Sequence, residues 1–176
     1  ILRASAYGPV RILVPMVSSR EEIMAVRRRL KRVAGNLRKQ GAEVADDIPL
    51  GAMIEVPSAA IALHAFVDVV DFLSVGTNDL IQYLLAADRN NDTLGDLYSP
   101  LHPGVIRLLK HIINIANEHR TPVAVCGEIA GDAAMTPLLL ALGLTEFSLH
   151  PATLLEVRKA IRECDLSALK ARSSKL

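Results

Sequence analysis

The stretch that follows a predicted buried strand, Phe72–Val75, has the residue types of an anion site. Gly76 ends that strand and allows a tight turn because it carries no Cβ, and a helix is expected to begin near Asp79. The free N–H groups and the dipole at a helix start attract anions, whereas the Asp79 carboxylate would repel one unless a divalent cation lay between them. This pattern indicates a metal-bridged phosphate. The alternative is that Asn78 and Asp79 simply cap the helix.

Three further reactive side chains follow other predicted strands or helices. Glu55 ends the second strand, Arg89 opens a polar loop, and Cys126 ends the fourth strand beside a glycine. Glu55 and Asp79 together suit Mg²⁺, which prefers one or two carboxylates and completes its shell with water and substrate phosphate. Arg89 offers a planar fork of donors to phosphate oxygens, and Cys126 could exchange a proton with carbon. Each alone has an ordinary structural explanation, so the hypothesis depends on their sharing one edge of a sheet.

The elements that must position these residues alternate regularly along the chain. Apolar runs predict five strands, over Val10–Val17, Ile48–Val56, Phe72–Val75, Thr121–Cys126 and Glu146–Leu149. Helical patterns follow them, from Ser18 to Gly41, Pro57 to Val67, Asp79 to Asp88, Gly104 to His119, Thr136 to Gly143 and Pro151 to Cys164. With no hairpin signal, this order predicts an α/β fold with a parallel sheet. Right-handed crossovers bring all carboxyl ends of the strands to one edge.

A barrel, or part of one, is the predicted architecture. A Gly-x-Gly-x-x-Gly pattern does not follow the first strand, which disfavours a dinucleotide-binding fold. In a barrel, the active site lies at the carboxyl ends of the strands. Glu55, Asn78, Asp79 and Cys126 all fall there. The loop from Arg89 to Pro103 is long for a connection, and such loops are usually functional or disordered.

Composition narrows the class of protein. The chain has 176 residues, 51% of them hydrophobic and 3% aromatic, which predicts one domain with an aliphatic core. A net charge of +1 argues against nucleic-acid or membrane binding driven by bulk charge. Cys126 and Cys164 have neither metal-type spacing nor the makings of a disulfide framework, which indicates a reducing cytoplasm. No membrane-spanning run or signal-peptide pattern is present.

Further predictions concern the first long helix, the C-terminal tail and three residues near the strand ends. Ser18 and Glu21 have capping-box spacing at the start of the first long helix. The basic residues of that helix are expected to be solvated: Arg27, Arg28, Arg29, Lys31 and Arg32. The polar tail to Leu176 is expected to fray. Three further residues are expected near the carboxyl ends of the strands, an edge called the rim below: Glu128, His102 and His150. Nothing in the sequence selects a role for any of them.

Four segments together resemble the phosphoenolpyruvate-utilising barrel family, in particular the enzyme I branch of the bacterial phosphoenolpyruvate:sugar phosphotransferase system. They are GAMIEVPSA at 51–59, FLSVGTNDLIQY at 72–83, DRN at 88–90 and CGEIAG at 126–131. The resemblance implies that Glu55 and Asp79 bind Mg²⁺ and that Asn78 and Arg89 bind phosphoenolpyruvate. It implies that Cys126 protonates the enolate carbon as pyruvate forms.

The resemblance also implies what lies outside this chain. The family's barrel has eight strands, so residues 1–176 are expected to be the last five βα units of a (β/α)8 TIM-type barrel. Earlier strands would supply further arginines, and an absent N-terminal domain would carry the phosphohistidine that serves a histidine-containing phosphocarrier protein. We therefore expect no turnover by this chain alone, and association into a homodimer.

Other interpretations remain open at this point. Pyruvate phosphate dikinase and phosphoenolpyruvate synthase share these motifs, and nitrogen-regulatory or fructose-fusion forms of enzyme I are not distinguished. A non-catalytic dimerisation fragment that has kept the site is possible. So is a Mg²⁺-dependent aldolase or lyase on the same barrel type, although it would have little use for Cys126.

Overall fold

Five parallel strands form a single sheet in the computed structural model, which describes residues 1–91 and 97–173. The strands are β1 (Ile12–Val14), β2 (Leu50–Ile54), β3 (Phe72–Gly76), β4 (Val123–Cys126) and β5 (Glu146–Phe147). Their spatial order is β1-β2-β3-β4-β5. Each strand pairs with the next in sequence, without the reversal of order that defines a doubly wound sheet. The sheet is an open arc of a (β/α)8-type barrel, which confirms the predicted fold class.

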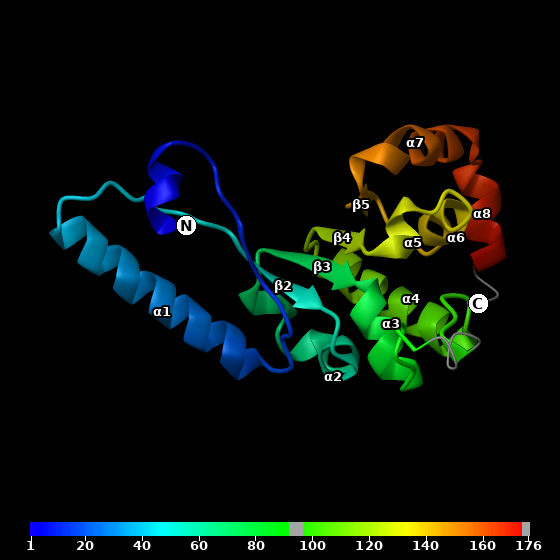
Figure 1. Ribbon diagram of the computed structural model, residues 1–176, viewed down its shortest axis with the longest axis horizontal. Helices are drawn as coiled ribbons and strands as arrows, with labels where there is room; N and C mark the ends of the chain where they lie inside the picture. Colours follow the sequence, from blue (N-terminus) through cyan, green and yellow to red (C-terminus); the bar gives the residue numbers. More distant parts are fainter. Residues whose placement is uncertain (92–96, 174–176) are drawn as a thin grey trace.

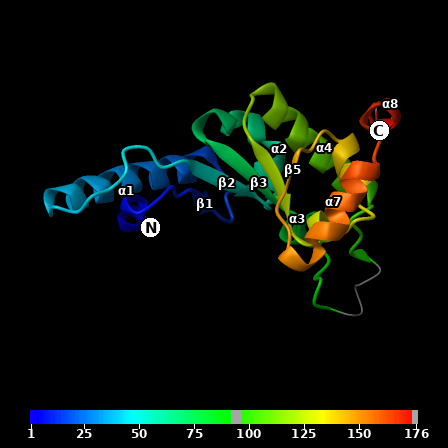
Figure 2. The same ribbon diagram turned by 90° about the horizontal axis from the view of Figure 1, so that it is seen from above.

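Helices connect and follow the strands. They are η1 (Leu2–Ala6), α1 (Arg20–Lys39), α2 (Pro57–Ile61), η2 (Leu63–Ala65), η3 (Val67–Val69), α3 (Thr77–Leu85), α4 (Pro103–Glu118), α5 (Glu128–Gly131), α6 (Thr136–Ala141), η5 (Pro151–Thr153), α7 (Leu154–Glu163) and α8 (Leu166–Ser173). Helices α2, α3 and α4 contact one another and lie along one side of the sheet (Figure 1). Helix α1 projects well beyond the sheet, with the N-terminal segment beside its far half (Figures 1 and 2).

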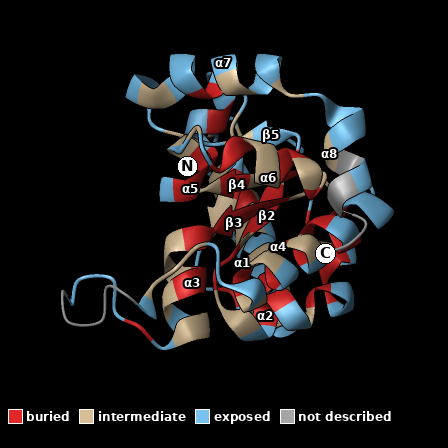
Figure 3. Cartoon of the chain, turned by 90° about the vertical axis from the view of Figure 1, so that its right-hand side faces the viewer, coloured by how far each residue is buried: buried red, intermediate tan, exposed pale blue. Residues whose placement is uncertain are grey.

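The two faces of the sheet differ in chemistry because side chains alternate along each strand. The face toward the helices is apolar, and its central residues are at most 5% exposed: Ala52, Ile54, Leu73, Val75, Val123 and Val125. Buried residues concentrate there and on the helices that cover it (Figure 3). Apart from Met53 and Phe72, the opposite face carries small or polar residues: Gly51, Ser74, Gly76, Ala124 and Cys126. In a closed barrel this second face would line the interior.

The capping box of α1 lies one residue later than predicted. Glu22, rather than Glu21, accepts hydrogen bonds with its Oε2 from the backbone N–H groups of Ser18 (2.7 Å) and Ser19 (3.0 Å). These bonds hold the pKa of the Glu22 carboxyl below its ordinary value of 4.5. The helix therefore begins at Arg20 with Ser19 as its N-cap.

Arg27 is not solvated like its neighbours, contrary to prediction. Its Nε donates to the Val69 carbonyl (2.9 Å), and a terminal nitrogen pairs with Asp71 at 2.8 Å. The same Asp71 oxygen accepts from the backbone N–H of Leu50 (2.7 Å), so Arg27 ties α1 to the starts of β2 and β3. The other basic residues predicted to be solvated, Arg28, Arg29, Lys31 and Arg32, are exposed as expected.

Three other expectations about helices need correction. The segment predicted as one helix over 57–67 is α2 followed by two short 3-10 helices. The unpredicted α5 lies within the CGEIAG segment. The tail predicted to fray forms α8 as far as Ser173 and contacts α6, while residues 174–176 lie outside the described residues. The predicted loop 89–103 is partly described, since 92–96 also fall outside.

No helix in the described ranges, 1–91 and 97–173, is both long and apolar enough to cross a membrane.

Candidate functional site at the carboxyl ends of the strands

Glu55 follows the last residue of β2 and is buried, with 4% of its surface exposed. Its Oε1 accepts a hydrogen bond from the backbone N–H of Met16 (2.7 Å), just beyond β1. Its Oε2 lies so close to Gly76 that a Cβ at that position would be 2.6 Å from it. Gly76 has a φ of −80°, so glycine is not needed for a left-handed backbone. The close approach instead agrees with the prediction that this turn depends on the absence of a Cβ. Glycine is required there because a side chain would displace the Glu55 carboxylate.

Helix α3 begins at Thr77, two residues earlier than predicted. Its N-cap is Gly76, and no side chain caps the helix. The alternative that Asn78 and Asp79 cap this helix is therefore wrong, because both lie within its first turn. The first-turn N–H groups and the positive end of the helix dipole are directed at the space beyond β3. Asp79 places a carboxylate in the same turn.

The turn after β4 is bonded directly to the start of α3. Thr77 Oγ1 donates to the Cys126 carbonyl (2.6 Å), and the backbone N–H of Glu128 donates to Asn78 Oδ1 (2.9 Å). Asn78 Nδ2 approaches Glu128 Oε1 at 3.4 Å. Gly127, which lies between Cys126 and Glu128 in the chain, has a φ of +96°, and a Cβ there would lie 2.8 Å from Asn78 Oδ1. Only glycine satisfies both the backbone conformation and the close approach.

The Cys126 thiol lies on the face of the sheet away from the helices. Cys126 pairs with Gly76 in the β3–β4 register, so it flanks the glycine that Glu55 contacts from the other side. The Ser74 hydroxyl donates to Cys126 Sγ (3.4 Å), and the thiol donates to the Val75 carbonyl (3.3 Å). The half-buried thiol is thus held in place by two hydrogen bonds. The structure brings Glu55 and Cys126 to the same edge of the sheet, on either side of Gly76.

Tyr98, a residue that sequence reasoning missed, lies near enough to both Asp79 and Arg89 to feel their charges. Its hydroxyl donates to the Asn78 carbonyl (3.2 Å). Burial is the main cause that raises the pKa of Tyr98, the charges of Glu128 and Asp79 raise it further, and Arg89 opposes them. Tyr98 therefore lies within electrostatic range of all three charges. No local signal marked it, because it sits in an irregular polar loop and meets Asn78 only in the folded chain.

The two histidines at the rim, His102 and His150, are the N-cap residues of the helices that follow them. His102 Nδ1 accepts from the backbone N–H of Gly104 (3.0 Å), and His150 Nδ1 accepts from that of Ala152 (3.3 Å). Each precedes a proline that opens a helix. His150 also borders a cavity of about 410 Å³ at the rim, lined by Asn78, Gly127, Glu128, Gly131, Asp132, His150 and Thr153.

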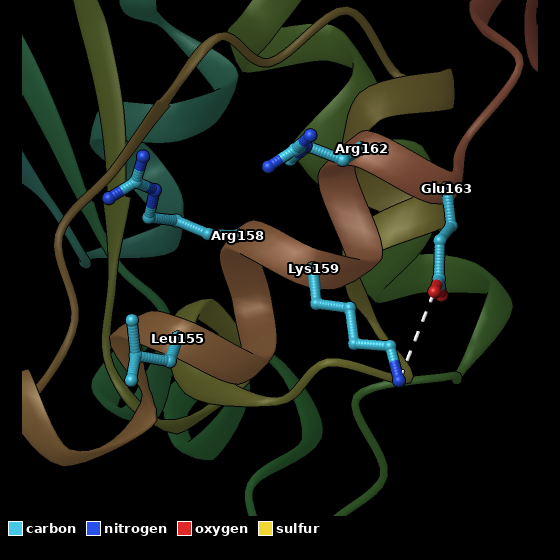
Figure 4. A pocket seen from close by; sticks show the side chains of 5 residues that line it. All are labelled: Leu155, Arg158, Lys159, Arg162 and Glu163. Atoms are coloured by element: carbon cyan, nitrogen blue, oxygen red, sulfur yellow. Dashed lines mark ion pairs between the residues drawn. The ribbon is translucent and has the colours of Figure 1, made fainter.

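A hollow of about 480 Å³ beside α7 has a different character (Figure 4). Its lining residues are Leu155, Arg158, Lys159, Arg162 and Glu163. Lys159 and Glu163 form an exposed ion pair at 3.9 Å. All five residues belong to one helix, so side chains from separate elements do not converge there as they do at the rim.

The rim has oxygen ligands of the kind that Mg²⁺ prefers. Glu55 is a buried carboxylate, and neither it nor Asp79 takes part in an ion pair within the described residues. A carboxylate buried without a cation is costly, so a divalent ion fits this position. Within the same residues no cluster of three or more His, Cys, Asp or Glu could enclose a metal.

Comparison with known proteins gives matches over nearly the whole chain. Residues 1–166 match the family described as "PEP-utilising enzyme, PEP-binding domain". The chain is 49% identical over 161 residues to the phosphoenolpyruvate-protein phosphotransferase of Cupriavidus necator, covering 92% of this chain and 28% of that protein. It is 43% identical over 175 residues to the Staphylococcus carnosus protein of the same name, covering 99% and 30%. The chain thus spans less than a third of these relatives.

Solved structures share the fold at low sequence identity. A citrate lyase from Burkholderia xenovorans LB400 aligns with a TM-score of 0.64 and 21% identity, over 99% of this chain and 57% of its own. An HpcH/HpaI aldolase from Desulfitobacterium hafniense DCB-2 aligns with a TM-score of 0.51 and 20% identity, over 87% and 64%. These likenesses concern the barrel architecture alone.

Proposed function

The chain belongs to the PEP-binding domain family of PEP-utilising enzymes, and from this premise we propose that its rim binds phosphoenolpyruvate (PEP) together with Mg²⁺. The observation that carries the proposal is the position of Glu55. Its carboxylate is buried against Gly76, at the start of a helix whose first turn no side chain caps. A carboxylate and a helix N-terminus directed at the same space call for both a cation and an anion, and Mg²⁺–PEP supplies the two.

We assign the following roles to the chain's own residues. Glu55 and Asp79 would hold Mg²⁺, which when bound neutralises charge on the phosphate and carboxylate oxygens of PEP. Asn78 and the first-turn N–H groups of α3 bind oxyanions of the ligand. Arg89 adds a bidentate donor for the phosphate. Positioning and charge neutralisation are the main demands of phosphoryl transfer.

Cys126 is the proposed acid toward carbon. Loss of the phosphoryl group from PEP leaves the enolate of pyruvate, whose methylene carbon must gain a proton. The thiol is half-exposed and on the open face of the sheet, where it donates to the Val75 carbonyl. It can turn from that carbonyl to the enolate carbon, and the Ser74 hydroxyl would remain as a donor to the resulting thiolate.

For the whole protein we propose a phosphoenolpyruvate-protein phosphotransferase. In this proposal, a separate N-terminal domain carries the histidine that accepts the phosphoryl group and passes it to a phosphocarrier protein during sugar uptake. Residues 1–176 form part of the PEP-binding barrel domain, the protein acts in the cytoplasm, and the barrel domain is a homodimer. The identities of 49% and 43% to proteins of that name support this assignment.

Isothermal titration calorimetry of this chain with PEP tests the site, performed once in the presence of Mg²⁺ and once in the presence of EDTA. We expect Mg²⁺-dependent binding, a loss of at least about tenfold in affinity for Glu55→Gln and for Asp79→Asn, and no change for Glu146→Gln. Glu146 is a matched control because it is an exposed glutamate at the start of β5. Equal binding in EDTA, or full affinity in Glu55→Gln, would contradict the assignment. Steady pyruvate release by this chain alone would contradict the proposed division between two domains.

A further inference from the structure

Glu128 lies at the rim, and the proposed function gives it no task. It begins α5, directly after the Gly127 turn, and its side chain is exposed. Its side-chain hydrogen bonds in the described part of the chain involve Asn78: the backbone N–H donates to Oδ1 at 2.9 Å, and Oε1 lies 3.4 Å from Nδ2. One residue thus contacts both ends of the Asn78 amide.

These two contacts select one orientation of the amide. A backbone N–H can only donate a hydrogen bond, so the amide atom that faces it must be oxygen. The Asn78 NH2 group then lies on the other side, where the Glu128 carboxylate can accept one of its two N–H bonds. The second N–H remains for an acceptor beyond the protein. Rotation of the amide by 180° would bring two donors together and leave the carboxylate facing an oxygen.

We infer that Glu128 is a positioning residue that holds the Asn78 amide so that its NH2 group is presented to an oxyanion at the end of β3. Only the identity of that oxyanion, PEP, rests on the proposed function. The orientation of the amide follows from the contacts alone.

Further contacts connect the surrounding turn to the start of α3. Thr77 is fully buried, and its hydroxyl fastens the β4 turn to the start of α3 through the Cys126 carbonyl. Gly127 allows the backbone to approach Asn78 within contact distance. The rim cavity of about 410 Å³ borders both Asn78 and Glu128, which leaves space for a ligand beside the amide.

The carboxylate is needed as an acceptor and not as a charge. A negative charge close to an anion site opposes binding of the anion. The inference therefore separates two variants. Glu128→Gln keeps an acceptor oxygen and removes the charge, whereas Glu128→Ala removes both.

The first test needs no ligand. In ¹⁵N NMR of the whole chain, the Asn78 side-chain NH2 signals, assigned by their loss in Asn78→Ala, should show restricted motion in a heteronuclear NOE experiment. The restriction should persist in Glu128→Gln and weaken in Glu128→Ala, which keeps the backbone N–H contact but loses the carboxylate, with the backbone spectrum otherwise retained. A mobile amide in the parent chain, or an unchanged one in Glu128→Ala, would overturn the inference.

The second test is a double-mutant cycle on PEP affinity in the presence of Mg²⁺. Glu128→Ala should weaken binding about tenfold, Glu128→Gln should stay within about threefold of the parent, and Glu128→Ala should have no effect in the Asn78→Ala background. Additive effects of the two alanine variants would show that Glu128 does not act through Asn78. A parent chain that is folded but does not bind PEP would instead refute the proposed function, and the NMR experiment would still decide the inference.

Discussion

The two faces of the sheet are built from the same five strands and do different work. On the face toward the helices, Leu73 and Val75 of β3 are at most 1% exposed and contribute through burial. On the other face of the same strand, Ser74 bonds to the Cys126 thiol and Gly76 makes room for the Glu55 carboxylate. A strand of five residues thus alternates between residues that stabilise the fold and residues that prepare a site. Substitutions one position apart should therefore have effects of different kinds.

The largest effect on stability is expected from Leu73→Ala on the helix-covered face. Removing this side chain leaves a cavity and should lower the free energy of unfolding by about 3 to 4 kcal/mol, measured by urea denaturation. Met53→Ala is the control on the opposite face, where Met53 is partly exposed and pairs with Ser74. It should cost less than about 1.5 kcal/mol. Equal losses would show that both faces are packed alike.

The next largest loss of stability is expected from Gly127→Ala, because this substitution strains the turn after β4 at the rim, although it leaves the apolar core unchanged. A φ of +96° and the contact with Asn78 predict a loss of about 2 to 3 kcal/mol. Gly35 in the middle of α1 has open space around it, so Gly35→Ala should stabilise the chain by about 0.5 to 1 kcal/mol. Opposite signs for two glycine-to-alanine changes would confirm that the rim turn depends on glycine. A neutral Gly127→Ala would contradict it.

A smaller loss should follow from Arg27→Ala on α1. This residue bonds to Val69 and Asp71 and joins α1 to the sheet, but both members of the ion pair are more than a third exposed. The expected loss is about 1 kcal/mol and should shrink in high salt. Arg28→Ala, one residue along and exposed, should have almost no effect. If both variants behave alike in thermal unfolding, Arg27 has no special role.

The smallest effect should appear as a pH dependence at the start of α1. Because folding lowers the pKa of Glu22, its contribution is present above the ordinary value of 4.5 and is lost as the pH falls through the folded-state pKa. Glu22→Gln should therefore lower the melting temperature slightly near pH 7 and leave it unchanged near pH 3. Glu21→Gln is the control. A Glu22→Gln effect that grows on acidification would contradict the capping role.

Sequence reasoning predicted the alternation of strands and helices and the residues that follow the strands because both depend on local patterns. Alternating apolar runs and helical stripes define βα units, and parallel strands bring their carboxyl ends to one edge. Glu55, Asn78 and Cys126 could be grouped before their distances were known. The capping box illustrates the limit, because the doublets Ser18-Ser19 and Glu21-Glu22 offer two pairs with the same spacing. Only the folded helix start distinguishes them.

The contacts that sequence could not supply are those between distant segments. Glu128 meets Asn78 across 50 residues, and Arg27 meets Asp71 across 44. Tyr98 reaches Asn78 from an irregular loop, where no periodicity indicates the direction of a side chain. The group that excludes a side chain at Gly76 was also hidden, since the Glu55 carboxylate comes from another strand.

The unbroken order of the strands bears on how the chain comes to be folded. Each strand pairs with the one synthesised just before it, so no strand must wait for a later partner to be inserted between two earlier ones. The sheet can grow from β1 to β5 as the polypeptide leaves the ribosome, each new βα unit docking on a completed predecessor. The turn holding Asn78 would then be made first, and locked only when the segment bearing Gly127 emerges.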